Sequence, residues 1–380
     1  MNNIKSFSIV TALSLGAAAC SDPIKTDAVA TYSQIVEASY ADSISTAQVL
    51  AASLDDLVAS PSAAALTDAQ TAWLDSREPY LQTEVYRFYD GPIDNPDDGP
   101  EGLLNAWPLD EFYIDYVVDD PTAGIINGTD SIDAASLEAL NGVGGESNVA
   151  TGYHAIEFLL WGQDLSDTGP GERPYTDYVT DGSGTADNQD RRGTYLTVTG
   201  DLMVKHLNEV HGQWTSGADY RAEFESDEDV AFEKILTGMI VLAGFETGGE
   251  RLQASLDAGD QEEEHSCFSD NTHRDMIQDV QGILNVWTGT YTGTDGSNID
   301  GTGVYDVVND QDEDLASRLD AQIRTSLDLA NALQPPYDQE IAPGSEGNDR
   351  VAALVESLRE TEDILFEVFD AFGLSVTIPE

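Results

Sequence analysis

Two polar residues in an otherwise apolar segment form the first group that could carry chemistry. His154 and Glu157 are three residues apart. On a helix this spacing places both side chains on one face, where an imidazole nitrogen and a carboxylate can share a cation. Tyr, Ile, Phe, Leu and Trp surround the pair, which argues against a merely solvated pair. An ordinary hydrogen-bonded pair on a helix surface is the alternative.

A second group lies in the polar segment 262–275. His265, Asp270 and His273 are candidate metal ligands there. Thr272 and Asp275 match a capping box, which predicts that a helix begins at this point and explains part of the polarity. The capping box does not explain the remaining polar residues. We therefore predict that the segment contributes to a site.

A third group follows one face of the second expected helix. Trp73, Arg77, Tyr80, Glu84 and Arg87 recur at steps of four and three residues. A helix that faces an apolar core would carry Leu or Val at these positions. The pattern predicts a buried polar network or the lining of a cleft, with an exposed face of Glu/Arg pairs as the alternative. Glu84 is a further candidate ligand, and the first three residues are expected to line the cleft.

The elements that must position these groups are helices, because apolar residues recur at helical spacing and no segment indicates a sheet. We predict an all-α protein whose first helix spans residues 26–58. The second should begin at a capping box, Thr67 to Gln70, and kink at Pro79. The Gly-rich loop 166–190 is expected to separate two helical bundles, residues 20–190 and 191–380. Further helices are expected at 131–140, 149–161, 192–214, 228–257, 272–290, 313–333 and 347–371.

The first residues resemble an export signal. A basic start at Lys5 precedes an apolar run and the small residues 16–19, which end at Cys20. Residues 1–19 are therefore expected to be a signal peptide, with Cys20 as a bacterial lipoprotein attachment site. Ordinary cleavage before a free cysteine is the alternative. Ser21 favours the outer membrane, so we expect a cell-envelope lipoprotein that faces the periplasm or the cell surface.

Charge and cysteine content exclude several classes of protein. The net charge is −55, from 71 acidic and 16 basic residues, so nucleic acid and anionic membrane surfaces are repelled. The same charge attracts cations. Two cysteines exclude a disulfide framework. The acidic loop Asp295 to Asp300 hints at calcium, but it lacks the EF-hand spacing, and a solvated loop is the better interpretation.

Several motifs follow one another along the chain. They are Trp73-x-x-x-Arg77 leading to Glu84 and Gly91-Pro-Ile-Asp94, Ala106-Trp-Pro-Leu-Asp-Glu111 with Ile114-Asp115-Tyr116, Gly152-x-His154-x-x-Glu157 followed by Leu160-Trp161-Gly162, and the segment Glu264 to His273. With these motifs in this order, the chain resembles the imelysin family of bacterial envelope proteins, which includes insulin-cleaving proteins and iron-regulated lipoproteins. The resemblance implies an all-helical fold of two bundle-like halves, with His154 and Glu157 in a cleft between them.

The resemblance implies either a metallopeptidase or a protein of iron acquisition. The zinc-peptidase motif H-E-x-x-H is absent, and Phe158 interrupts its inverted form. A zinc peptidase with His154 and Glu157 would need a further histidine ligand and Glu84 as base. We therefore expect a non-enzymatic protein that binds iron or an iron chelate in the cleft, with an outer-membrane or periplasmic iron-transport partner. A metal-free scaffold for a peptide or glycan is the third hypothesis. The expected metal ligands are His154 and Glu157, followed by Glu84, His265, Asp270 and His273.

Overall fold

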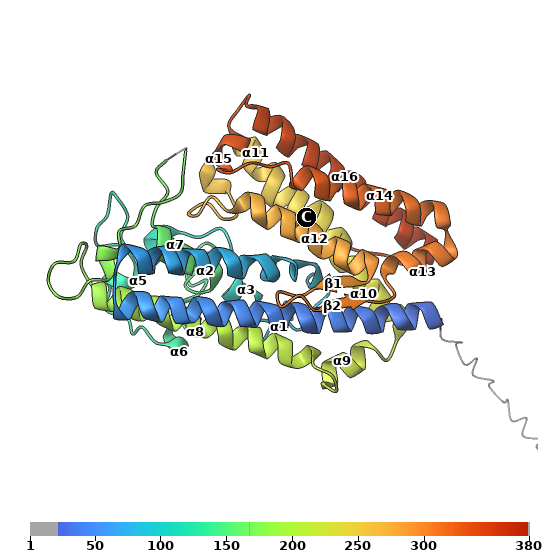
Figure 1. The fold of residues 1–380 in the computed structure, drawn as a ribbon, viewed down its shortest axis with the longest axis horizontal. Coiled ribbons are helices and arrows are strands. Elements are labelled where there is room, and N and C mark those ends of the chain that lie inside the picture. Colours follow the sequence, from blue (N-terminus) through green and yellow to red (C-terminus); the bar gives the residue numbers. More distant parts are fainter. Residues whose placement is uncertain (1–21, 167, 379–380) are drawn as a thin grey trace, which may run out of the picture.

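The computed structural model describes residues 22–166 and 168–378 (Figure 1). The expected signal peptide and the expected lipid attachment at Cys20 lie outside this range. Within it, every helix is too short or too polar to cross a membrane.

The N-terminal bundle is built around one long helix, α1 (Pro23–Ala59). Asp22 caps it by accepting the N–H groups of Ile24 and Lys25. Its buried face packs against α2 (Ala63–Leu81) and α8 (Gln189–Trp214), and α7 (Gly152–Trp161) packs against both α2 and α8. In Figure 1 these helices form the lower part of the molecule. The bundle therefore buries α7 among longer helices.

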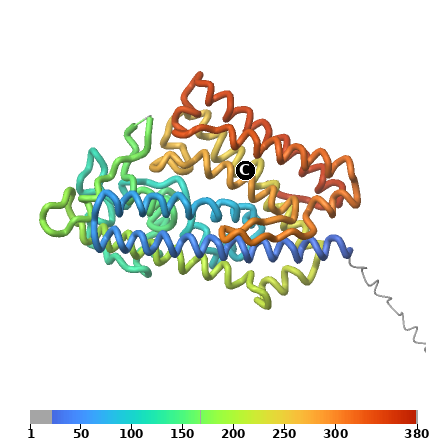
Figure 2. The backbone as a smooth tube through the Cα atoms, in the orientation of Figure 1, coloured from blue at the N-terminus to red at the C-terminus, as the bar shows by residue number. Residues whose placement is uncertain are grey.

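The C-terminal bundle consists of α10 (Glu228–Ile240), a π-helix η3 (Val241–Gln253), α12 (Thr272–Thr288), α13 (Val304–Gln311), α14 (Glu313–Ala330) and α16 (Glu346–Phe372). α16 packs on α14 and η3. α12 packs on α14 within this bundle and on α2 of the other. The tube in Figure 2 shows the C-terminal segments lying along one side of the N-terminal helices. α12 and α2 thus form the junction of the bundles.

Short elements connect the long helices. β1 (Thr290–Thr292) and β2 (Asn298–Asp300) form an antiparallel pair in which Tyr291 opposes Ile299. The other short elements are η1 (Glu84–Tyr86), α3 (Glu101–Leu104), α4 (Glu111–Ile114), α5 (Gly124–Asn127), α6 (Ala134–Leu140), η2 (Tyr175–Tyr178), α9 (Asp219–Phe224), α11 (Ala254–Ala258), η4 (Gln261–Glu263) and α15 (Asp338–Ile341).

The all-α prediction is confirmed, but the start of α2 was predicted too late. The helix begins at Ala63, and Ser62 caps it by accepting the Ala65 N–H at 3.1 Å. Thr67 lies inside the helix, where its hydroxyl donates to the carbonyl of Ala63. The three alanines that open α2 are the strongest helix formers, so the helix extends upstream of the expected capping box.

The expected boundary near residue 190 falls in the first turn of α8. This helix packs on α1 and α7, so residues just beyond 190 complete the N-terminal bundle. The sequence assigns them to the C-terminal half because the Gly-rich loop before them resembles a linker.

Candidate functional site

The helix α7 carries His154 and Glu157 into the interior. Gly152 begins it with φ +87°, and a Cβ there would lie 2.4 Å from the carbonyl oxygen of Leu104. Only glycine permits this backbone approach. All residues of α7 are buried, and His154 and Glu157 are 2% and 0% exposed. Their burial excludes the alternative of a solvated surface pair.

The His154 ring is fixed through one nitrogen. Its Nδ1 lies 2.9 Å from Glu157 Oε2. The other carboxylate oxygen, Oε1, accepts the N–H of Ser269 at 3.0 Å and its hydroxyl at 2.6 Å. His154 Nε2 is buried, and no residue in the described ranges forms a hydrogen bond with it. Glu157 therefore orients the ring, and Nε2 is the nitrogen that could bind a ligand.

His265 faces His154, and its ring is also held through Nδ1 by a carboxylate. The rings of His154 and His265 lie 4.9 Å apart and are inclined by 72°. His265 Nδ1 lies 2.7 Å from Asp275 Oδ2, which also accepts the Ser266 hydroxyl at 2.5 Å. Metal-binding histidines commonly hold one ring nitrogen against a carboxylate and bind the metal with the other. Both histidines have this arrangement.

Burial and nearby positive charge keep both imidazoles neutral. Burial, followed by the charge of Arg77, lowers the pKa of His154 well below its usual value. Burial, followed by the charge of Arg251, lowers the pKa of His265 to about 3. A neutral imidazole keeps a nitrogen lone pair for a metal ion. Protons therefore do not compete for these nitrogens at neutral pH.

The two carboxyl groups that orient the histidines differ in charge. Burial raises the pKa of Glu157 to about 8, so this group is largely protonated at neutral pH. Burial also acts to raise the pKa of Asp275, but Arg77 and His265 overcome it and hold the pKa far below the usual range. Arg77 Nη2 lies 3.2 Å from Asp275 Oδ2, and both side chains are fully buried. Asp275 is therefore the permanent anion of the site.

Glu84 lies beside the histidine pair but is engaged by arginines. Its Oε2 accepts hydrogen bonds from Arg251 at 2.5 Å and from Arg87 at 2.7 Å. Burial raises its pKa, yet these two charges lower it to about 2. The opposite oxygen, Oε1, has no hydrogen-bond partner in the described part of the chain. Glu84 also shifts the pKa of His154, which places it within electrostatic reach of that ring.

The three aromatic and cationic residues of α2 do not line an opening. Trp73, Arg77 and Tyr80 are each 0% exposed. The Trp73 indole N–H donates to the carbonyl of Tyr153 at 2.9 Å. The Tyr80 ring lies 4.6 Å from the Tyr153 ring, and the Arg77 guanidinium lies 4.8 Å from it. The expectation of a cleft lining is corrected: α12 and α7 pack against α2 and enclose this face.

Asp270 and His273 are placed differently from His265. His273 Nδ1 lies 3.2 Å from the backbone oxygen of Asp270, and within the described residues no hydrogen bond or ion pair joins His273 to His154 or His265. The Asp270 carboxylate converges instead with Asp164 and Asp338. In the described chain, these three form the only group of three or more His, Cys, Asp or Glu residues whose ligand atoms lie within 4.8 Å of one another. The histidine pair thus lacks a third protein ligand at that separation.

Sequence reasoning missed the residues that support the site. Asp275 was assigned to a capping box, but the cap of α12, Asn271, makes no side-chain capping bond. Asp275 instead joins His265 and Arg77. No local sequence pattern indicates a role for Ser269 or Arg251 at the site. Their partners, Glu157 and Glu84, are far away in the sequence.

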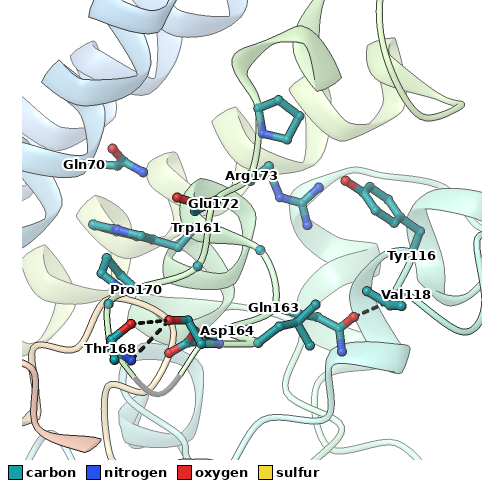
Figure 3. Close-up of a pocket in the computed structure, with 16 residues that line it drawn as sticks. Gln70, Tyr116, Val118, Trp161, Gln163, Asp164, Thr168, Pro170, Glu172 and Arg173 are labelled. Carbon is teal, nitrogen blue, oxygen red and sulfur yellow. Dashed lines mark hydrogen bonds between the residues drawn. The ribbon is translucent and has the colours of Figure 1, made fainter. Parts of the chain in front are cut away.

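A surface cavity of about 680 Å³ opens at the C-terminal end of α7 (Figure 3). Trp161 and Gln70 lie toward one side of it, and Tyr116 and Val118 lie toward the other. Asp164 is also part of its wall. None of the buried histidine and glutamate residues lines this cavity.

Comparison with known proteins identifies the fold family. The imelysin family model matches residues 36–365. The chain belongs to the imelysin family. It is 24% identical over 323 residues to iron-regulated protein A of Synechococcus elongatus, covering 81% of this chain and 76% of that protein.

Two crystal structures of imelysin relatives share this fold. One is a candidate iron-regulated protein A precursor from Parabacteroides distasonis, with a TM-score of 0.72, 18% identity, and coverage of 94% of this chain and 97% of that one. The other is an imelysin-like protein from Psychrobacter arcticum, with a TM-score of 0.65, 12% identity, and coverage of 94% and 99%. At these identities the likeness establishes the fold alone.

Proposed function

We propose that this imelysin-family chain binds iron or an iron chelate through the Nε2 atoms of His154 and His265. The observation that carries the proposal is the pair of facing, buried imidazoles, each with Nδ1 against a carboxyl group. Imidazole nitrogen is a suitable iron ligand. The name of the Synechococcus relative, iron-regulated protein A, agrees with this cargo.

Glu157 acts in this proposal as a positioning residue, which revises its expected role as a direct ligand. Its two oxygens are occupied by His154 and Ser269. Because two histidines leave an iron ion under-coordinated, water or the donor atoms of a chelate complete its coordination shell. Glu84, which is ionised, lies within electrostatic reach of both rings and has an Oε1 atom without a hydrogen-bond partner in the described residues, so it could join them. The near-complete burial of both rings means that the bundle junction must open for binding.

Binding without catalysis is supported by the state of the two candidate bases. Glu157, with a pKa near 8, is mostly protonated at neutral pH and cannot accept a proton from water. Glu84, with a pKa near 2, is a weak base that is held by two arginines. A polypeptide substrate also needs an open cleft, whereas these residues are buried. A zinc peptidase is the competing function.

We further propose that the chain works in the bacterial cell envelope as a lipoprotein, in the outer membrane, with an iron-transport partner. The apolar leader that ends in small residues and Cys20 supports export and lipidation. The net charge of −55 supports enrichment of cations near the surface.

The test is an anaerobic Fe²⁺ titration of metal-free protein, purified without affinity nickel, in competition with a chelator. We expect one saturable site whose affinity falls at least tenfold in His154→Ala and in His265→Ala. His206→Ala is the matched control, because His206 pairs with Glu209 at the same spacing but has a carboxylate oxygen near each ring nitrogen, that of Glu209 at 3.0 Å from Nδ1 and that of Glu138 at 3.1 Å from Nε2. Unchanged affinity in both site variants would refute the proposal.

The peptidase hypothesis is tested with an unfolded protein substrate. Metal-dependent cleavage by the wild type that disappears in Glu157→Gln would establish catalysis and overturn the binding function. We expect no cleavage by either protein at any metal concentration that saturates the site.

A further inference from the structure

Three aspartate side chains from separate segments converge near the end of α7. Asp164 follows this helix, Asp270 precedes α12, and Asp338 begins α15. Each offers an oxygen within 4.8 Å of the others, and the residues are 4%, 5% and 7% exposed. Figure 3 shows Asp164 on the segment that follows Trp161. Three carboxyl groups are thus buried together at the bundle junction.

The hydrogen bonding of this cluster is incomplete. Asp164 Oδ1 accepts the N–H of Ser166 at 2.9 Å. Within residues 22–166 and 168–378, no donor reaches the other oxygen of Asp164 or either oxygen of Asp270. A buried carboxylate without a compensating partner is strongly unfavourable. The side chain of Asp270 therefore points into a space that lacks a positive group.

Neighbouring negative charges make it still less favourable to ionise these carboxyl groups. Burial raises the pKa of Asp270 to about 8, and the carboxyl groups of Asp338, Asp164 and Glu157 add to this effect. Burial and two neighbouring carboxyl groups likewise raise the pKa of Asp164 to about 6. Every charge that shifts these two groups is negative. Either a cation or shared protons must neutralise the cluster.

We propose that Asp164, Asp270 and Asp338 bind a divalent cation of the calcium type. Carboxylate oxygens alone suit hard cations such as Ca²⁺, whereas zinc and iron sites in proteins usually include nitrogen or sulfur ligands. Oxygens up to 4.8 Å apart fit one Ca²⁺ ion, because ligands on its opposite sides are roughly 4.6–5.2 Å apart. The site is separate from the proposed iron site and does not depend on it.

The cation would fix the segment that supports Glu157. Asp270 directly follows Ser269, whose N–H and hydroxyl both bind Glu157 Oε1. Asp164 lies three residues beyond α7, the helix that carries His154. A bound ion would thus join the end of α7, the loop before α12 and the start of α15. The three aspartates are cation ligands and, for the histidine site, positioning residues.

Calcium titration of the EDTA-treated full-length mature protein tests this inference. The titration is done in about 0.5 M NaCl to screen the acidic surface. We expect one saturable site per chain and a Ca²⁺-dependent rise in Tm, both lost in Asp164→Asn and Asp270→Asn. Asparagine accepts the left-handed backbone of Asp270, whose φ is +57°, so this variant should fold.

The matched control is Asp295→Asn in the exposed acidic hairpin, which should bind Ca²⁺ like the wild type. Far-ultraviolet circular dichroism confirms that each variant is folded. If both cluster variants are folded and bind Ca²⁺ as tightly as the wild type, the inference is wrong. The absence of a saturable site in the wild type also overturns it and means that protons neutralise the cluster. Neither outcome involves the histidines, so the proposed iron binding is judged independently.

Discussion

At the scale of single residues, Asp115 shows how strongly this fold depends on buried ion pairs. Its carboxylate receives Arg173 Nη1 at 2.8 Å and Arg192 Nε at 2.6 Å, and all three side chains are nearly inaccessible. Arg192 Nη2 donates to the other oxygen at 2.9 Å. Removing one partner from a buried pair leaves an uncompensated charge.

We predict that Asp115→Asn lowers the free energy of unfolding by about 3–5 kcal/mol, because two buried guanidinium groups lose their shared anion. Urea unfolding followed by circular dichroism measures this change. The control is Asp314→Asn, which removes a partner 3.6 Å from Arg318 on the surface and should change little. Equal decreases in the free energy of unfolding of the two variants would contradict the stabilising role of the buried ion pairs of Asp115.

The pH dependence of this pair follows from the direction of its pKa shift. Burial acts to raise the pKa of Asp115, but Arg173 and Arg192 lower it below its usual value. The folded state therefore holds the ionised form more tightly than the unfolded state does. The stabilisation is present above the ordinary aspartate pKa and is lost as the pH falls below it.

Residue types and local spacing were sufficient to single out His154 and Glu157, because both lie on one helix face. They were not sufficient for Asp275, whose partner Arg77 lies 198 residues away in the sequence. A capping box is a local pattern, and the long-range hydrogen bonds of Asp275 override it. The role of Glu157 as an orienting group also depends on Ser269, which no local pattern connects to it.

At the scale of elements, the contact between α12 and the C-terminal end of α2 depends on a glycine. A Cβ on Gly282 would lie 2.6 Å from the backbone oxygen of Gln82, the C-cap residue of α2. Backbone cannot move aside as a flexible side chain can. This contact holds Asp275 on α12 close to Arg77 on α2.

We predict that Gly282→Ala lowers the free energy of unfolding by about 1–3 kcal/mol and also weakens iron binding, because α12 must shift away from α2. Thermal unfolding and the Fe²⁺ titration measure the two effects. Gly212→Ala in α8 is the control, since a Cβ there meets no atom within 4 Å. It should leave iron binding unchanged and stabilise the helix slightly. Retention of wild-type stability by Gly282→Ala would contradict the close packing.

The long helices could be predicted because their apolar residues repeat over many turns, and most of their bounds differ from the prediction by a few residues. The second helix is an exception, because it was expected to run toward Tyr89 and to carry Glu84 and Arg87 but ends at Leu81. Two features could not be predicted. The π-helix η3 interrupts what the sequence shows as one continuous helix from residue 228, and its altered turn places Arg251 beside Glu84 and Asp279. The hairpin of β1 and β2 is too short for an alternating pattern to stand out.

At the scale of the whole molecule, the net charge of −55 opposes folding through self-repulsion. Salt screens this repulsion, because the Debye length falls from roughly 10 Å at 0.1 M to 3 Å at 1 M. We predict that the urea midpoint rises between these two NaCl concentrations. The same series in KCl controls for specific sodium binding. A midpoint that falls with both salts would contradict the prediction that self-repulsion dominates the salt dependence of stability.

Lipidation of Cys20 is the proposed attachment of the whole chain to the membrane. We predict that Cys20→Ser moves the protein from the membrane fraction to the soluble envelope fraction, because the acyl chains supply its apolar anchor. Fractionation followed by immunoblotting measures the distribution. A Cys267→Ser variant controls for loss of a thiol and should remain in the membrane. If Cys20→Ser also remains there, the proposed anchoring is wrong.

Anomalous diffraction at the iron absorption edge can locate iron between His154 and His265 and is the decisive experiment for the proposed function. The protein would be saturated with Fe²⁺ anaerobically in solution and then crystallised, because the buried site must open for binding, and data would be collected above and below the edge. The account predicts an iron peak within bonding distance, roughly 2.0–2.2 Å, of the Nε2 atoms of both histidines. Iron peaks only at other positions, with none between the two rings, would contradict it.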